Sequence, residues 1–291
     1  MLHTIKSETL RADINPIGAE LSSLYSQKTG KEYLWQGDPT WWAGRAPVLF
    51  PILCAMKDDT YIYNGKTYNM PKHGFVRQAA FNTTGAEGAK IVFEYTDNEE
   101  TRGLYPFAFL FQVIFELSGN TLITTYRTEN HNNCPMYFSF GSHEAYRCPR
   151  EEGESFSDYY LEFDKDGTYI SEKANDAGLL SGETFTVIEN GRIIPLTPEL
   201  FACDTLVFKN VQSSKIFLKS RKSPEVVEVD YQDAPYLGIW TKIGAPYVCI
   251  EPWYGLPDEN CHDGRIENKL GIITVPANGS FEWTHTITVH E

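Results

Sequence analysis

Alternation of apolar and polar residues is the main pattern along this chain. It runs through the segments 90–96 (KIVFEYT), 111–130, 158–164 (DYYLEFD) and 214–220 (SKIFLKS), which turn-forming residues separate. A period of two residues is typical of β-strands that bury one face and expose the other. The pattern therefore predicts a chain built from many short strands.

Turn residues indicate how some of these strands connect. The sequence SGN at 118–120 separates two alternating runs and predicts a β-hairpin. The segment 271–290 (GIITVPANGSFEWTHTITVH) predicts another pair of strands around PANGS. No segment shows a helical period over a useful length, and 198–203 predicts at most one short helical turn.

The same pattern bears on domain organisation. Linker-like composition occurs only at 149–157 and around 171–183, and both segments are typical of ordinary polar loops. All-β sandwiches often exceed about 200 residues as one unit, so 291 residues do not require two domains. We expect an all-β protein in which residues 1–291 form a single large antiparallel β-sandwich with few short helices. A two-domain split near residue 150 has less support.

Composition narrows the classes of partner. The net charge is −14, from 39 acidic and 25 basic side chains, which argues against nucleic acid and against anionic membrane surfaces. The first 16 residues lack the apolar core of a signal peptide, and no apolar run of roughly 18 residues follows. The six cysteines form no C-x-x-C pair, and Cys249 lies in an apolar run as a small core residue would. These features predict a cytoplasmic protein.

Glu251 raises the first question about chemistry. It follows the apolar run 247–250 and precedes Pro252, Trp253 and Tyr254. Burying a carboxylate costs several kcal/mol unless it is paired, hydrogen-bonded or protonated. Either a functional site or a structural ion pair would explain this position.

Other polar groups interrupt apolar or aromatic stretches in the same way. Each has a structural alternative: a solvated turn for His73, a core histidine for His143, a surface cation for Arg45, a turn cap for Asp204 and core packing for Trp240. One carboxylate, two histidines and an arginine nevertheless form a set that can carry out general acid–base chemistry on a neutral polyol.

Metal binding has weak support in the sequence. No H-E-x-x-H or H-x-H spacing occurs, and His262-Asp263 lies among Asn, Gly and charged residues that are more typical of a solvated loop. We therefore expect neither a metal nor an organic cofactor.

The order of the motifs resembles a known family. Six motifs in this order together resemble the aldose 1-epimerase (galactose mutarotase-like) superfamily, and within it the LacX-like branch. They are GRAPVLFPI (44–52), PKHGFVR (71–77), FSFGSHEAYRCP (138–149), CDTLVF (203–208), EPWYGLPD (251–258) and GRIENKLGIITVPANGSF (264–281). The resemblance runs from about residue 10 to the C-terminus. It implies a large β-sandwich that interconverts the α and β anomers of a free hexose such as galactose or glucose, without metal or organic cofactor.

The resemblance also implies roles for individual residues. Glu251 matches the general base that takes the proton of the C1 hydroxyl. His143 matches the general acid that protonates the ring oxygen, and His73 matches a histidine that polarises this oxygen. Arg45 and Asp204 match substrate-binding residues, and Trp240 is a candidate stacking surface for the sugar.

One departure from the family pattern follows His143. Many relatives have Pro and an aromatic residue there, whereas this chain has Glu144, Ala145 and Tyr146. We expect this loop to line the pocket and a nearby Glu144 to raise the pKa of His143.

Several alternatives remain open at this point. The cations near the motifs allow a hexose 6-phosphate as substrate; they are Lys72, Arg77, Arg147 and Arg150. A non-catalytic sugar-binding or sugar-sensing protein on the same fold is a second alternative. A retaining glycosidase that uses Glu251 with Asp204 or Glu144 is a third. The sequence leaves open which sugar is bound and whether the protein is a monomer or a homodimer.

Overall fold

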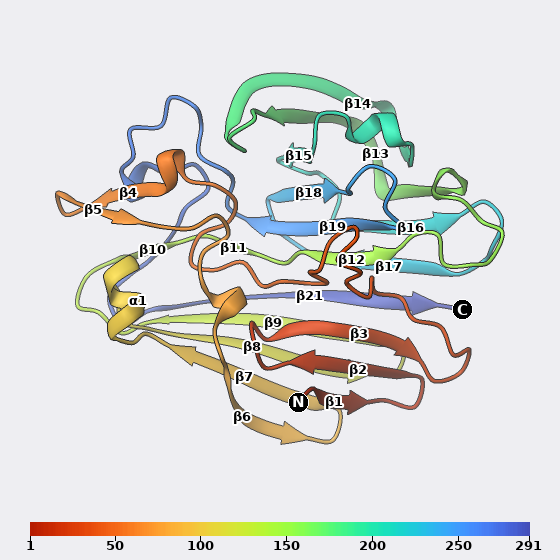
Figure 1. Ribbon diagram of the computed structural model, residues 1–291, viewed down its shortest axis with the longest axis horizontal. Helices are drawn as coiled ribbons and strands as arrows, with labels where there is room; N and C mark the ends of the chain where they lie inside the picture. The colour runs from red at the N-terminus through yellow and green to blue at the C-terminus, as the bar shows by residue number, and fades with distance from the viewer.

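The computed structural model describes residues 1–291, and antiparallel strands make up most of it (Figure 1). The largest sheet has 14 strands. Twelve of them follow one another in the order β11 (Phe140–Gly141), β19 (Tyr247–Tyr254), β18 (Tyr236–Trp240), β15 (Leu206–Lys209), β13 (Tyr159–Ala174), β16 (Lys215–Ser220), β17 (Val226–Asp230), β21 (Ser280–His290), β9 (Thr121–Asn130), β8 (Phe109–Ser118), β7 (Lys90–Thr96) and β6 (Asn82–Glu87). In addition, β12 (Glu144–Arg147) pairs with β19, and β14 (Leu180–Pro195) pairs with β13. The predicted all-β class is confirmed.

Smaller elements complete the fold. A three-stranded sheet contains β1 (His3–Lys6), β2 (Leu10–Asn15) and β3 (Glu20–Ser26), and two-stranded sheets pair β4 (Thr60–Tyr63) with β5 (Lys66–Asn69) and β10 (Met136–Phe138) with β20 (Ile273–Val275). Helical structure is limited to α1 (Glu99–Leu104) and the short 3-10 turns η1 (Lys57–Asp59), η2 (Val76–Gln78), η3 (Phe156–Asp158), η4 (Pro198–Phe201) and η5 (Ile266–Asn268). The turn η4 confirms the short helical turn expected at 198–203. These helices are too short to reach across a lipid bilayer.

The core lies between packed sheets, as a sandwich requires. Along β8, the side chains alternate between buried and half-buried, and the buried ones include Phe109, Phe111 and Phe115. The strands β1 and β2 pack against β8 and contribute Ile5 and Leu10 to the same core. This core joins 60 buried hydrophobic residues. Strands from both sides of residue 150 take part in the large sheet.

The turn predictions had mixed outcomes. The hairpin at 118–120 is confirmed, with Ser118 opposite Thr121. Two strands do flank PANGS, but they do not pair with each other, because β20 pairs with β10 while β21 lies between β9 and β17.

The prediction of a loop around 171–183 was largely wrong. There β13 and β14 form a long hairpin, with Ser171 opposite Phe185 and Ala174 opposite Leu180. The strand β14 is mostly exposed, so it lacks the apolar alternation by which strands are recognised.

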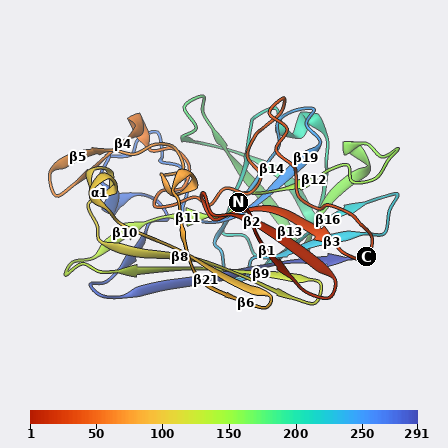
Figure 2. The ribbon, with the colours of Figure 1, turned by 60° about the horizontal axis from the view of Figure 1, so that its bottom comes forward.

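The strand β19 positions the residues of interest. Its side chains alternate, so Val248 and Ile250 point into the main core while Cys249, Glu251 and Trp253 belong to the opposite face. Figure 2 shows β12 and β19 in the upper part of the molecule, above β8, β9 and β21. Glu251 therefore continues a strand but faces away from the main core.

Candidate active site

Strand register brings His143 opposite Glu251. The strand β11 pairs with β19 up to Gly141, and β12 resumes pairing in the same register at Glu144. The two residues between these strands, 142 and 143, span the break without a shift. His143 therefore lies across from Glu251, although the two are far apart in the sequence.

Pro252 explains part of the break in this ladder. Proline has no backbone N–H and cannot donate to the neighbouring strand. Its carbonyl still accepts a hydrogen bond from the Ser142 N–H, at 3.2 Å. On the other side of β19, Gly238 pairs with Glu251, and a Cβ at Gly238 would lie 2.3 Å from the ring of Trp253. Pro252 and Gly238 thus leave room for the side chains on this face of the sheet.

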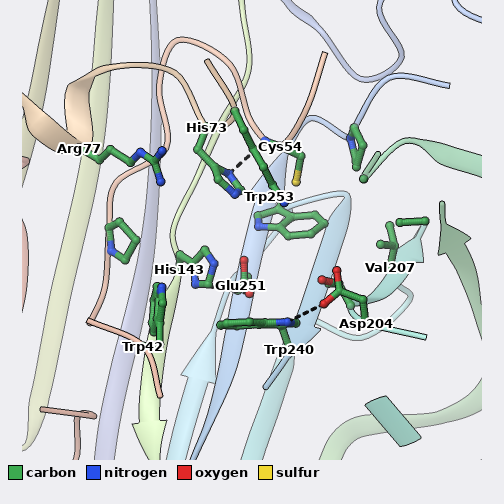
Figure 3. Close-up of a pocket in the computed structure, with 16 residues that line it drawn as sticks. Trp42, Cys54, His73, Arg77, His143, Asp204, Val207, Trp240, Glu251 and Trp253 are labelled. Carbon is green, nitrogen blue, oxygen red and sulfur yellow. Dashed lines mark hydrogen bonds and ion pairs between the residues drawn. The ribbon is translucent and has the colours of Figure 1, made fainter. Parts of the chain in front are cut away.

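A cavity of about 290 Å³ opens above this part of the sheet (Figure 3). Five of the six residues predicted from the sequence line it, namely His73, His143, Asp204, Trp240 and Glu251. Its walls also include Trp42, Cys54, Lys72, Arg77 and Trp253. In Figure 3, His143 and Glu251 approach each other at the centre of these residues, with His73 and Trp253 to one side and Trp240 to the other.

His143 and Glu251 form a buried polar contact at the cavity. Nδ1 of His143 lies 3.4 Å from Oε1 of Glu251, and the two residues are 9% and 2% exposed. Burial, followed by the negative charge of Glu144, raises the pKa of Glu251 well above its usual value. Burial lowers the pKa of His143 to about 4. An acid and a base with opposed pKa shifts are therefore in contact in one cavity.

His73 is held in one orientation by two hydrogen bonds to Cys54. The backbone N–H of Cys54 donates to Nδ1 of His73 at 3.2 Å, and the His73 N–H donates to the Cys54 carbonyl at 2.9 Å. Burial, with the nearby His143 and the cations Lys72 and Arg77, keeps the pKa of His73 well below its usual value. Because Nδ1 accepts a hydrogen bond, the proton of the neutral ring is on Nε2, which can donate to a ligand.

Two tryptophans form aromatic walls next to His143. Trp42 stacks on the His143 ring, with centroids 5.0 Å apart and planes 28° apart. Trp240 meets Trp42 edge to face at 5.5 Å, and its indole N–H donates to Oδ1 of Asp204 at 2.8 Å. Sequence reasoning missed Trp42, and the Trp41-Trp42 pair just before GRAPVLFPI was the available signal.

Arg45 does not reach the cavity. Its side chain donates to the Gln36 carbonyl at 3.0 Å, and its backbone N–H donates to Glu20 at 2.9 Å. These bonds close the loop that carries Trp42. The cavity lining gives no support to Arg45 as a substrate-binding residue, and Arg77 is the arginine that lines it.

Comparison with known proteins identifies the family. The family model for aldose 1-epimerase matches residues 1–276. The chromosomal LacX protein of Lactococcus lactis subsp. lactis is 31% identical over 294 aligned residues, which cover 98% of each chain. The chain belongs to the aldose 1-epimerase family.

Solved structures agree with this assignment. A galactose mutarotase related enzyme from Lactobacillus acidophilus has a TM-score of 0.96 at 34% identity, covering 100% of this chain and 98% of that one. A galactose mutarotase-like protein from Lactobacillus casei has a TM-score of 0.94 at 29% identity and is covered completely, as is this chain. The fold is therefore that of the galactose mutarotase-like proteins.

In this aldose 1-epimerase family member, Glu144, Ala145 and Tyr146 do not line the cavity, contrary to our expectation. They form β12 and are buried. Oε1 of Glu144 lies 3.3 Å from Nε2 of the buried His285. Its charge does favour protonation of His143, but burial outweighs it and lowers the His143 pKa. Because Glu144 lies outside the cavity, it does not serve as the partner of Glu251 that a retaining glycosidase would need.

A buried ion pair supports one wall of the cavity. Nζ of Lys269 donates to Oδ1 of Asp258 at 2.6 Å, and both side chains are fully buried. Asp258 also accepts the backbone N–H of Lys57 at 2.9 Å and donates its own N–H to Ala55 at 3.0 Å. These bonds fix the segment next to Cys54. His262, which we expected in a solvated loop, instead has a buried side chain 3.8 Å from Asp258.

Proposed function

We propose that this protein is an aldose 1-epimerase that interconverts the α and β anomers of a hexose such as galactose or glucose. The observation that carries the proposal is the contact between His143 and Glu251 within a cavity, at 3.4 Å. The family assignment gives the chemical context for this pair. The six cysteines are all free, which fits the cytoplasmic location that we propose.

The reaction needs one proton removed and one delivered. Glu251 takes the proton of the C1 hydroxyl as the bond between C1 and the ring oxygen breaks. The pair holds one proton, and the reaction starts from the form in which this proton lies on His143. His143 gives it to the ring oxygen, which leaves an open-chain aldehyde with a hydroxyl at C5. Rotation about C1–C2 presents the other face of the aldehyde. The two proton transfers then run in reverse as the ring closes, so no atom or electron is gained or lost.

The remaining cavity residues hold the sugar. We assign to His73 a hydrogen bond from Nε2–H to the ring oxygen, since its Nδ1 is occupied by Cys54. Asp204 accepts hydrogen bonds from sugar hydroxyls, and Trp240 packs its apolar face against the C–H side of the sugar ring. Arg45 acts indirectly in this proposal, because its bond to Gln36 closes the loop that carries Trp42.

A phosphorylated hexose is the second candidate substrate. Lys72 and Arg77 line the cavity, and neither forms an ion pair with an acidic residue. Two cationic side chains without an ion-pair partner, in a protein of net charge −14, favour a ligand with an anionic group. Arg147 and Arg150, the other two cations considered, lie outside the lining.

Magnetisation-exchange NMR on a panel of free and 6-phosphorylated aldoses tests the proposal. Faster α/β exchange of free galactose or glucose than in buffer supports a mutarotase for free sugars. Acceleration confined to the phosphates supports the second candidate. Saturable binding without acceleration of any sugar would instead identify a sugar-binding protein and refute the proposed reaction.

A further inference from the structure

Cys249 is a third reactive side chain next to the His143–Glu251 pair. It precedes Glu251 by two residues in β19, so both side chains lie on the same face of the sheet. A ring nitrogen of His143, the Cys249 sulfur and a carboxylate oxygen of Glu251 all lie within 4.8 Å of one another. The proposed sugar chemistry has no use for Cys249, which is fully buried.

These three groups form a set of metal ligands. Imidazole nitrogen, thiolate sulfur and carboxylate oxygen are the usual protein ligands of Zn²⁺. Bonds of about 2.0–2.3 Å to a tetrahedral ion place neighbouring ligand atoms roughly 3.3–3.8 Å apart. The His143–Glu251 distance of 3.4 Å already lies in this range. The thiol needs to move by no more than about 1 Å, which rotation of a short side chain provides.

Two further observations favour an ion at this place. Nδ1 of His143 is buried and has no hydrogen-bond partner, so it is available to an ion in the tautomer that leaves this nitrogen unprotonated. The cavity next to the pair leaves space for a water molecule as fourth ligand, as in three-residue zinc sites. The charge also balances, because a divalent cation neutralises one carboxylate and one thiolate.

We propose that His143, Cys249 and Glu251 bind Zn²⁺, and that the ion inhibits the enzyme reversibly by occupying its acid and base together. The thiol proton and the one proton held by the His143–Glu251 pair are both released to solvent when the metal binds, so binding strengthens as the pH rises. The inhibitory part rests on the proposed function, whereas the metal-binding part does not.

Cobalt spectroscopy tests the site without reference to activity. Co²⁺ replaces Zn²⁺ in such sites, and a thiolate ligand gives a near-ultraviolet charge-transfer band. Three cysteines that are not buried are first replaced by Ser, so that their thiols do not bind Co²⁺. They are Cys134, Cys203 and Cys261. We expect a band that saturates at one equivalent of Co²⁺ and disappears when Zn²⁺ is added.

A matched pair of variants assigns the ligand. Cys249→Ser should remove the band, whereas Cys54→Ser should retain it, because Cys54 is also buried at the cavity but lies outside the ligand set. Absence of a band in the starting protein, or its persistence in Cys249→Ser, would overturn the site. Cys249→Ala serves the same purpose if the serine variant does not fold.

Inhibition is measured separately. Zn²⁺ should slow anomer exchange in the starting protein and in Cys54→Ser, whereas Mg²⁺ should not. Cys249→Ser should retain exchange and require at least tenfold more Zn²⁺ for half inhibition. Equal sensitivity of the two variants would refute an inhibitory role of this site. A protein that shows the cobalt band but no mutarotation would refute the proposed function and keep the metal site.

Discussion

Nδ1 of His143 lies 3.4 Å from Oε1 of Glu251, and the register of β12 on β19 places the two residues opposite each other. Burial raises the pKa of the carboxyl and lowers that of the imidazole. The two groups therefore behave as a coupled pair that holds one proton over a range of pH. In the proposed reaction the sugar gives its hydroxyl proton to Glu251 and receives one from His143, so the pair still holds one proton after each step.

Removing either member of the pair should nearly abolish anomer exchange. A positioned proton donor or acceptor typically contributes about 10²–10⁴-fold to the rate, so Glu251→Gln and His143→Asn should each lose activity of this order. Polarimetry on freshly dissolved α-galactose or α-glucose measures the rate, and circular dichroism checks the fold. Glu116→Gln, at a half-buried position in β8 outside the cavity, is the matched control. A rate like that of wild type in either active-site variant would contradict the assignment.

The pH dependence of kcat/KM should be bell-shaped. As the pH falls toward about 4, His143 is protonated in addition to Glu251, and no base remains. As the pH rises through the Glu251 pKa, which lies well above the usual value, the pair loses its last proton and no acid remains. Activity should therefore peak between these limits, which initial rates across a buffer series would show. A profile without an alkaline limb would contradict a shared proton.

Glu144→Gln should move this whole profile to lower pH. The negative charge of Glu144 raises the pKa of Glu251 and also favours protonation of His143. Loss of this charge therefore lowers both pKa values and moves both limbs of the profile to lower pH. Lys72 and Arg77 act on His143 in the opposite sense and are unchanged in this variant. A purely structural role of Glu144 would reduce kcat but leave the limbs where they are. The pH profile therefore separates the two explanations.

The sequence predicted elements well where apolar alternation was strong, and less well elsewhere. The hairpin of β8 and β9 follows from alternating residues around a Gly-Asn turn, whereas the polar ribbon of β14 has no such signal. Candidate residues could be named from motifs, but their contacts depend on register between strands that are distant in sequence. Arg45 and Arg77 show the limit, because each lies within a motif and only Arg77 lines the cavity.

Gly74→Ala should displace His73 and reduce activity. Gly74 has φ of +68°, and a Cβ there would lie 2.2 Å from the Phe50 carbonyl oxygen, so the turn that carries His73 must move. Gly65 has φ of +75° with nothing within 4 Å, and Gly65→Ala is the matched control for backbone strain alone. Left-handed strain costs about 1–2 kcal/mol, so the control should unfold slightly earlier and remain active. Equal activity in the two variants would contradict the steric argument.

Lys269→Met should destabilise the protein much more than loss of an exposed lysine. It leaves the Asp258 carboxylate buried without its cation, which typically costs about 3–5 kcal/mol. Lys90→Met removes an ion pair with Glu116 whose side chains are 51% and 43% exposed, so it should cost about 0–1 kcal/mol. Urea unfolding measures both changes. The double variant Asp258→Asn/Lys269→Met should recover part of the loss, because it removes the uncompensated charge. If it is less stable than Lys269→Met, the hydrogen bond that the Asp258 carboxylate accepts from the Lys57 backbone N–H outweighs the cost of the buried charge.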